Sequence, residues 1–256
     1  MRYLVVENAV IEFRSGNNKL ITVPVGAFVD AIIDAHKVID QISDFKVNIF
    51  EILGMRNLSS FIGELFAASF IIVTGTKFRK NPHQDGYPDL LLMDDLGRRA
   101  YENLERHNHL QDKAPFSPFR NGGIEIKATV GSIPTPAKCR KLGLPHKPRI
   151  GDQRINILRG YDWKAHHRET NNLAGLFWDF IGNVPRITAI FFCSTLDEND
   201  WGKIIQPKKG GGRTTSVSIM TRQGVRKMYE NWILVYDEDP KYKKFLNRYN
   251  NGDLIP

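Results

Sequence analysis

Two acids and one lysine, carried on short apolar stretches, are the residues best suited to chemistry. Residues 124–130 (IEIKATV) alternate apolar and polar side chains, which is typical of a β-strand. Glu125 and Lys127 then lie on the same face of that strand, so that a carboxylate and an ammonium stand side by side. Asp89 follows Pro88 directly before the apolar run LLLM, which predicts a second short strand. If the two strands pair, Asp89 meets Glu125 across the ladder.

The pairing of two carboxylates restricts the chemistry of this region. Carboxylates a few Å apart repel each other and are costly to bury unless a divalent cation neutralises them. Carboxylate oxygens together with several retained waters suit Mg²⁺ in particular. We therefore predict a Mg²⁺ site at Asp89 and Glu125. Asp85, Asp94 and Asp95 are competing acids, but the glycines that follow them are typical of turns.

A third acid lies on a predicted helix over residues 60–73. The helix is preceded by residues that can cap it and ends near Gly75. Glu64 lies three residues after Phe61 and directly before Leu65, so we expect it to share the apolar face. Buried glutamates are rare unless they are paired or coordinate a metal. Glu64 is thus a candidate for a direct or water-mediated metal ligand, with pairing to a core arginine or a place at the helix rim as alternatives.

These residues together resemble a known family. Pro88-Asp89, a spacer and then Glu125-Ile126-Lys127, after a helix that carries Glu64, resemble the motif of the PD-(D/E)XK nucleases. In a chain of 256 residues the resemblance is greatest to type II restriction endonucleases. It extends over roughly residues 60–130 and implies the α/β core of that family.

The resemblance implies a role for each residue. Asp89 and Glu125 would bind Mg²⁺, with help from the Ile126 carbonyl, and Glu64 would act on a second metal or its waters. Lys127 would orient the attacking water or stabilise charge on the phosphate. The expected activity is Mg²⁺-dependent, sequence-specific cleavage of double-stranded DNA by a homodimer, leaving 5′-phosphate and 3′-hydroxyl ends. A cognate DNA methyltransferase would protect the host.

Two other functions stay open. One is a structure-selective or repair nuclease with the same core. The other is a DNA-binding protein without activity, in which Glu125 and Lys127 form a plain ion pair on an exposed strand face. Cleavage of ordinary plasmid DNA at defined positions separates the first alternative from a restriction enzyme, and binding without cleavage indicates the second.

The distribution of charge is compatible with a polyanionic partner. The chain has 36 Lys and Arg against 28 Asp and Glu, a net charge of +8 and a pI near 9.4. Two basic stretches, 138–159 and 203–227, are interrupted by glycine or proline and are predicted as loops that follow a phosphate backbone. The candidate DNA contacts in them are Lys138, Arg149, Gln153, Arg154, Lys208, Lys209, Arg213, Arg222 and Gln223.

Apolar periodicity predicts the elements that must position these residues. We expect helices over 27–41, 60–73 and 170–181, strands over 90–93, 123–130, 186–194 and 231–236, and a polar segment over 98–120. Strands interleaved with helices predict an α/β fold with a central mixed sheet flanked by helices. No composition shift divides the chain, so 1–256 is expected to form one domain with an N-terminal helical part and basic loops.

Composition excludes several classes of protein. With 41% hydrophobic and 25% charged residues the chain is neither disordered nor fibrous. Its longest apolar run, 65–73, is shorter than the roughly 20 residues that cross a bilayer, and the first residues lack the pattern of a signal peptide. We therefore expect a cytoplasmic protein. Cys139 and Cys193 have no spacing typical of zinc ligands or a disulfide framework and are expected to be reduced thiols.

Overall fold

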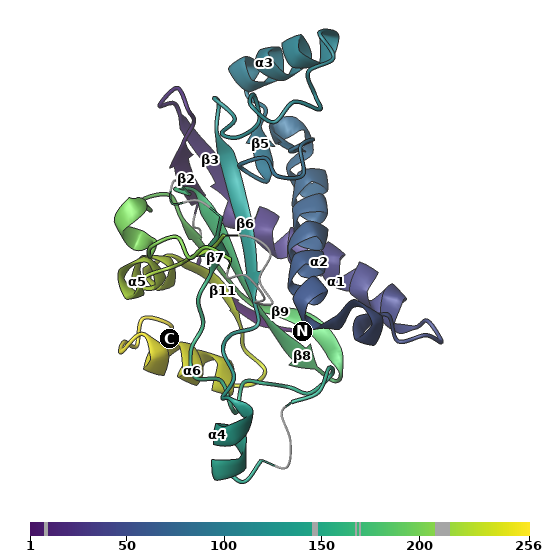
Figure 1. Cartoon of the computed structure of the whole chain (residues 1–256), viewed down its shortest axis with the longest axis vertical. Helices are drawn as coiled ribbons and strands as arrows, with labels where there is room; N and C mark the ends of the chain where they lie inside the picture. Colours follow the sequence, from purple (N-terminus) through teal and green to yellow (C-terminus); the bar gives the residue numbers. More distant parts are fainter. Residues whose placement is uncertain (8–9, 145–147, 167, 169, 208–215) are drawn as a thin grey trace.

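The centre of the fold is a seven-stranded mixed sheet (Figure 1). The computed structural model describes residues 1–7, 10–144, 148–166, 168, 170–207 and 216–256, except for the side chain of Arg56. In sheet order the strands are β1 (Tyr3–Val5), β11 (Trp232–Tyr236), β9 (Val184–Cys193), β8 (Leu173–Ile181), β6 (Gly123–Thr129), β5 (Leu90–Leu92) and β4 (Phe78–Lys80). Neighbouring strands are antiparallel except β6 and β8, which are parallel. The predicted α/β class with a mixed central sheet is confirmed.

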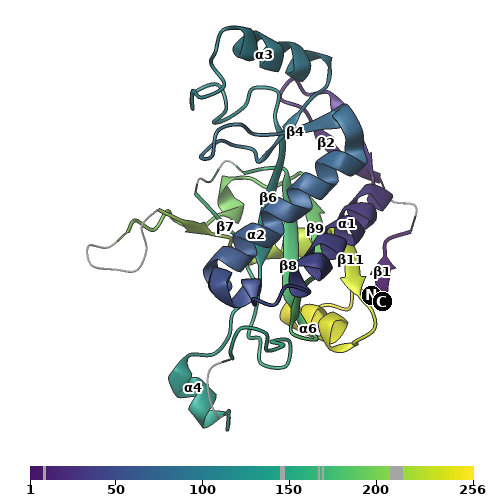
Figure 2. The ribbon, with the colours of Figure 1, turned by 90° about the vertical axis from the view of Figure 1, so that its right-hand side faces the viewer.

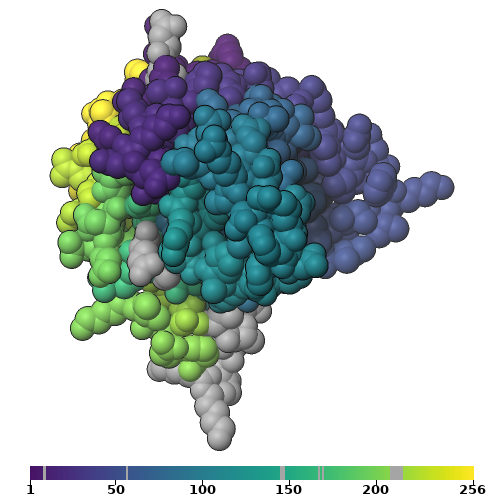
Figure 3. Space-filling model, turned by 90° about the horizontal axis from the view of Figure 1, so that it is seen from above, coloured from purple at the N-terminus to yellow at the C-terminus, as the bar shows by residue number. Residues whose placement is uncertain are grey.

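Two long helices, α1 (Val25–Ser43) and α2 (Ile49–Thr74), cover one face of the sheet (Figure 2). Asn48 caps α2, since its side chain accepts the main-chain N–H groups of Phe50 and Glu51. At Gly54 the backbone leaves the helical region, with φ of +65°, so α2 is kinked there. The helix predicted over 60–73 is thus the second part of a longer element. The junction of α1 and α2 projects at the right of the molecule in Figure 3.

The other face of the sheet is covered by α5 (Arg222–Glu230) and α6 (Lys241–Tyr249). They belong to a second core cluster that includes Phe177 and Phe191, whereas Trp178 and Phe192 face the α1–α2 side. Strand β8 is therefore buried on both faces. This burial corrects the helix predicted over 170–181: a strand covered on both sides is apolar throughout and lacks the alternation that reveals a half-buried strand.

Smaller elements surround the sheet. They are the hairpin of β2 (Val10–Arg14) and β3 (Leu20–Pro24), the ribbon of β7 (Lys164–Ala165) and β10 (Ser218–Ile219), the helices α3 (Asp95–Arg106) and α4 (Pro136–Lys141), and the 3₁₀ turns η1 (Gly75–Lys77) and η2 (Glu198–Asp200). The segment 98–120, expected only to be polar, thus begins within α3. A small cluster around Tyr101 and Phe116 attaches α3 to the sheet. Cys139 and Cys193 are both free and buried.

One stretch, Asn57–Lys77, is long and apolar enough to cross a membrane by length and composition. The apolar run over 65–73 lies within this stretch, which also contains Ser59, Ser60 and Glu64. The core helix of a soluble protein passes the same test. In the fold Leu58, Ile62 and Phe66 of this stretch are buried in the cluster between α2 and the sheet.

Candidate active site

The predicted strand pair brings Asp89 and Glu125 together. β5 and β6 pair antiparallel with Leu90 opposite Ile124, and this register places Asp89 at the position opposite Glu125. The main-chain N–H of Asp89 donates to Oε2 of Glu125 over 3.1 Å. In return the N–H of Ile126 donates to Oδ2 of Asp89 over 2.8 Å. The two carboxylates are thus fixed by the backbone of the facing strand.

A glycine permits this close approach of the strands. A Cβ atom on Gly123 would lie 1.8 Å from the carbonyl oxygen of Leu90, a distance that no side chain tolerates. Gly123 is therefore required where β6 begins, directly before the residues of the site. Its carbonyl oxygen also accepts a hydrogen bond of 3.2 Å from the side chain of Asn172, which leads into β8.

Lys127 lies between the two acids. Its Nζ is 2.5 Å from Oε1 of Glu125 and 3.4 Å from Oδ2 of Asp89. The prediction that Glu125 and Lys127 share a strand face is confirmed. The ammonium neutralises part of the negative charge of the two carboxylates. The position between the carboxylates is thus one that a positive charge already occupies.

Burial dominates the electrostatics of the site. Glu125 is only 4% exposed, and this burial raises its pKa to about 7, against the opposing charge of Lys127 and with a further increase from Asp89. Burial alone would lower the pKa of Lys127, but the two carboxylates and their hydrogen bonds outweigh it and raise that pKa. Lys127 therefore stays protonated at neutral pH.

The two carboxylates fit the requirements of Mg²⁺, which proteins commonly bind through one or two carboxylates while water fills the other positions. Asp89 and Glu125 would supply those ligands. Within the described part of the chain no group of three His, Cys, Asp or Glu side chains is arranged to hold a metal. Ile126 contributes its N–H to Asp89, and a role for its carbonyl stays a prediction.

Asp89 opens onto a cavity of about 370 Å³ between α2, β6 and the loop that joins β4 to β5, while Glu125 lies buried behind it. Lys127 and Asp89 line it, and so do Glu64 from α2 and His83 from the loop. Its polar lining therefore comes from three separate elements. The cavity is the place where a ligand can reach Asp89 and Lys127 together.

Glu64 differs from its prediction. Its side chain is 57% exposed and pairs with Lys80, whose Nζ lies 2.6 Å from Oε2. The apolar face of α2 is formed by Ile62 and Phe66, and Glu64 points away from it to the rim of the cavity. The expected place on the apolar face is wrong, and the partner is a surface lysine rather than a core arginine. A role at a second metal stays a prediction.

Two polar residues of the site were missed in the sequence. Asn81 is buried, and its side-chain amide donates to the carbonyl oxygens of Pro88 and Phe116 over 3.0 and 3.1 Å, which holds the loop before Asp89. Nδ1 of His83 accepts the N–H of Asp85 over 3.1 Å, so the neutral ring carries its proton on Nε2. The string NPHQDG between two short strands is the signal that marks this loop.

The predicted DNA contacts are spread over separate parts of the molecule. Lys138 lies on α4, Arg149 and Gln153 lie on the loop after it, and Arg222 and Gln223 begin α5, all of them exposed. None of these five lines the cavity. Lys208, Lys209 and Arg213 lie outside the described residues.

Arg154 is a correction among the predicted DNA contacts. It is 4% exposed, and its Nε is buried without a hydrogen-bond partner, so its side chain is not available to a duplex. Its main-chain N–H donates to the buried carboxylate of Asp179 over 2.9 Å, which draws this part of the basic loop inward. Charge alone could not distinguish this inward position from an exposed one.

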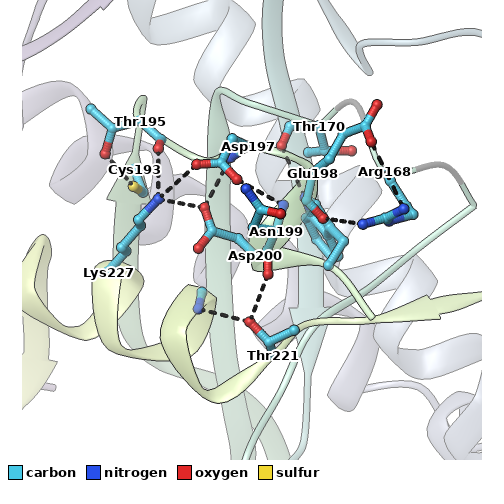
Figure 4. Close-up of polar contacts among 12 residues, drawn as sticks. Arg168, Thr170, Cys193, Thr195, Asp197, Glu198, Asn199, Asp200, Thr221 and Lys227 are labelled. Carbon is cyan, nitrogen blue, oxygen red and sulfur yellow. Dashed lines mark hydrogen bonds and ion pairs between the residues drawn. The ribbon is translucent and has the colours of Figure 1, made fainter. Parts of the chain in front are cut away.

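A second polar cluster lies where β9 ends (Figure 4). Nζ of Lys227 is 2.6 Å from Oδ2 of the fully buried Asp200 and 3.3 Å from Oδ2 of Asp197, and it donates to the carbonyl of Thr195 over 3.1 Å. These contacts attach α5 to the turn η2. Oδ1 of Asp200 is buried without a hydrogen-bond partner. The cluster has the form of a structural connection between elements.

Comparison with known proteins gives no family for this chain. No family model, no curated protein and no solved structure matches it.

Proposed function

We propose that the protein is a Mg²⁺-dependent endonuclease that cleaves double-stranded DNA at specific sequences, as type II restriction enzymes do. The observation that carries the proposal is the contact of the Lys127 ammonium with the carboxylates of both Asp89 and Glu125. The three side chains come from two paired strands, in the order that resembles the PD-(D/E)XK motif. Asp89 and Lys127 also line one cavity, where a phosphodiester could meet them.

Hydrolysis of a phosphodiester requires in-line attack by water and stabilisation of the charge that develops on the phosphate. When bound, Mg²⁺ lowers the pKa of a coordinated water and offsets that charge. Asp89 and Glu125 would hold the ion, because their carboxylates lie on facing strands and Asp89 lines the cavity. The main-chain N–H groups of Ile126 and Asp89 fix the orientation of these carboxylates.

Lys127 supplies the second positive charge. The carboxylates keep its pKa raised, so the side chain is an ammonium throughout the neutral range. From its position beside both acids it can donate a hydrogen bond to the attacking water or to a phosphate oxygen. No covalent intermediate is needed, and the products would carry 5′-phosphate and 3′-hydroxyl ends.

The substrate and partners follow from the same proposal. A net charge of +8 favours the approach of DNA, and the exposed basic residues outside the cavity can contact its backbone. Cleavage of both strands of a palindrome favours a two-fold homodimer. A companion DNA methyltransferase and a location in the cytoplasm belong to this proposal.

The proposal is tested with purified protein and unmethylated phage DNA, with and without Mg²⁺. We expect discrete fragments only with Mg²⁺, and sequencing of their ends should show one recurring site with 5′-phosphates. Cleavage confined to branched or single-stranded substrates would replace the proposal with a structure-selective nuclease. Binding without cleavage in Mg²⁺ or Mn²⁺ would replace it with a DNA-binding protein in which Lys127 and Glu125 form a structural ion pair.

A further inference from the structure

A second cavity, separate from the candidate active site, is lined by four arginines. It has a volume of about 880 Å³ and lies among α5, the end of α6 and the segment before β7. Arg222 and Arg226 lie one turn apart on α5, Arg248 lies in the last turn of α6, and Arg159 precedes β7. We call this set the arginine cradle. It shares no residue with the cavity at Asp89.

Three of the four guanidinium groups are free to bind a ligand. Nε of Arg226 pairs with Glu230 at 2.8 Å, but the side chains of Arg159, Arg222 and Arg248 make no hydrogen bond or ion pair with any described residue. Asp253 also lines the cavity and pairs with none of them. Three cations that have no partner among the described residues lie around one hollow and repel each other, and an anionic ligand would relieve that repulsion.

The wall of the cradle is held in place by partly buried hydrogen bonds. The hydroxyl of Tyr229 lies within hydrogen-bond distance of two acceptors, Oδ1 of Asn247 and, at 3.1 Å, the carbonyl oxygen of Gly252, and its single proton can be donated to either. It also accepts the N–H of Leu254 over 3.3 Å. These bonds attach the chain after α6 to α5, and Ile255 is buried beyond them. The arginines are therefore presented by a fixed hollow rather than by a free tail.

From this arrangement we propose that the arginine cradle binds consecutive phosphates of a nucleic-acid strand, outside the cleavage cavity. Guanidinium groups are the side chains that best match phosphate oxygens, because they donate paired hydrogen bonds and keep their charge. Four guanidinium groups from three segments line this cavity of about 880 Å³. The cavity is larger than a single phosphate group needs. The identity of the ligand as DNA rests on the proposed function.

The experiment measures binding without cleavage. Fluorescence anisotropy in EDTA gives the affinity of the protein for a labelled duplex of about 20 base pairs over a series of salt concentrations. The test variant is Arg222→Gln/Arg248→Gln. The matched control is Arg99→Gln/Arg106→Gln, which removes the same charge from α3, outside both cavities. Arg159→Gln provides a single variant on another segment, and circular dichroism checks that every variant is folded.

We expect the cradle variant to bind about tenfold more weakly than wild type, since a charge-assisted hydrogen bond contributes roughly that factor. The slope of log affinity against log salt should fall by about 0.9 for each phosphate that the variant no longer neutralises. The control should keep nearly the wild-type affinity and slope. Equal losses of affinity in the two double variants would overturn the proposal, since only net charge would then matter.

A second arm distinguishes a strand from a small anion. Calorimetric titration with inorganic pyrophosphate should show no tight site in wild type. Tight pyrophosphate binding that is lost in the cradle variant, with unchanged duplex affinity, would overturn the proposal in favour of a small phosphate ligand. Because both arms are run without a divalent metal, they do not depend on cleavage, and a protein that fails to cut DNA can still pass them.

Discussion

Asp89 and Glu125 stand opposite each other on two antiparallel strands, and the main-chain N–H of Asp89 donates to the Glu125 carboxylate over 3.1 Å. Two acids held this way would repel each other without a cation. The Lys127 ammonium supplies one positive charge between them. A metal ion that binds the two carboxylates must therefore either displace the Lys127 ammonium or lie beside it.

Magnesium should stabilise the folded protein through these two acids. At a concentration about ten times its Kd, a ligand of the folded state adds about 1.4 kcal/mol to the free energy of unfolding. In a chain of this length that corresponds to a rise in Tm of about 3 °C. We expect this rise in wild type and its loss in Asp89→Asn and in Glu125→Gln, measured by thermal unfolding with and without MgCl₂.

Asp85→Asn is the control for the magnesium measurement, since Asp85 is the nearby acid in the same loop. It should keep the full rise in Tm. Lys127→Ala should keep it or increase it, because its ammonium occupies the space between the acids. An unchanged rise in Glu125→Gln would contradict the assignment of the metal site.

His83 should contribute to the rate of cleavage. Its ring lines the cavity beside Asp89, and its proton is on Nε2 because Nδ1 accepts the N–H of Asp85. A hydrogen bond from Nε2 to the substrate that forms in the transition state would be worth about tenfold in rate. We expect His83→Ala to lower the single-turnover rate by that factor with little change in DNA affinity. Gln84→Ala, at the next position of the same cavity, should keep the rate, and equal rates in both variants would exclude the role of His83.

His36 should make the fold sensitive to acid. Its Nε2 accepts the N–H of Ile187 over 3.0 Å at the bulge between β8 and β9. Burial, with a further contribution from the charge of Arg186, lowers the pKa of His36 to about 3. The unfolded chain takes up this proton below about pH 6.5, so the stabilisation is complete above that pH and is lost as the pH falls toward 3.

Urea unfolding at two pH values checks this expectation. Between about pH 7 and pH 5 the contribution of His36 to the free energy of unfolding should fall by roughly 2 kcal/mol. His36→Gln keeps an acceptor for Ile187 but does not titrate, so its stability should fall less over the same interval. Equal losses of stability in the two proteins would show that another group is responsible.

The Lys227 cluster should affect stability and not chemistry. Loss of the ammonium in Lys227→Met leaves the buried carboxylate of Asp200 without its cation, at a cost of roughly 2 kcal/mol. Lys227→Met/Asp200→Asn removes both charges and should recover part of that loss. Denaturant midpoints of the three proteins measure it. If the double variant is less stable than Lys227→Met, the loss of stability in Lys227→Met does not come from an unpaired charge on Asp200.

The core of the candidate site could be predicted because its signals are local. The alternation of residues 124–130 places Glu125 and Lys127 on one face, and the short apolar run after Asp89 predicts its partner strand. Both strands and their pairing are confirmed. A period of two is decisive for β6 because its apolar and polar residues alternate, whereas the three buried leucines of β5 form a short apolar run.

The features that the sequence did not predict correctly depend on tertiary packing, which the periodicity of apolar residues does not report. The apolar pattern of β8 predicts a helix because both faces of the strand are covered. The spacing of Glu64 predicts a place on the apolar face, yet the strand edge near α2 leaves it exposed beside Lys80. The charge of Arg154 predicts a surface position, although its backbone is drawn inward by Asp179. In each case the neighbour that decides the outcome is distant in the sequence.

The most direct test of the central claim is the rate at which wild type and Lys127→Ala cleave a supercoiled plasmid in Mg²⁺. Lys244→Ala, which removes an exposed lysine of α6, is the matched control for loss of one positive charge. We predict discrete Mg²⁺-dependent products from wild type and from the control, and a loss of at least about a hundredfold in Lys127→Ala. Wild-type turnover in folded Lys127→Ala would contradict the account.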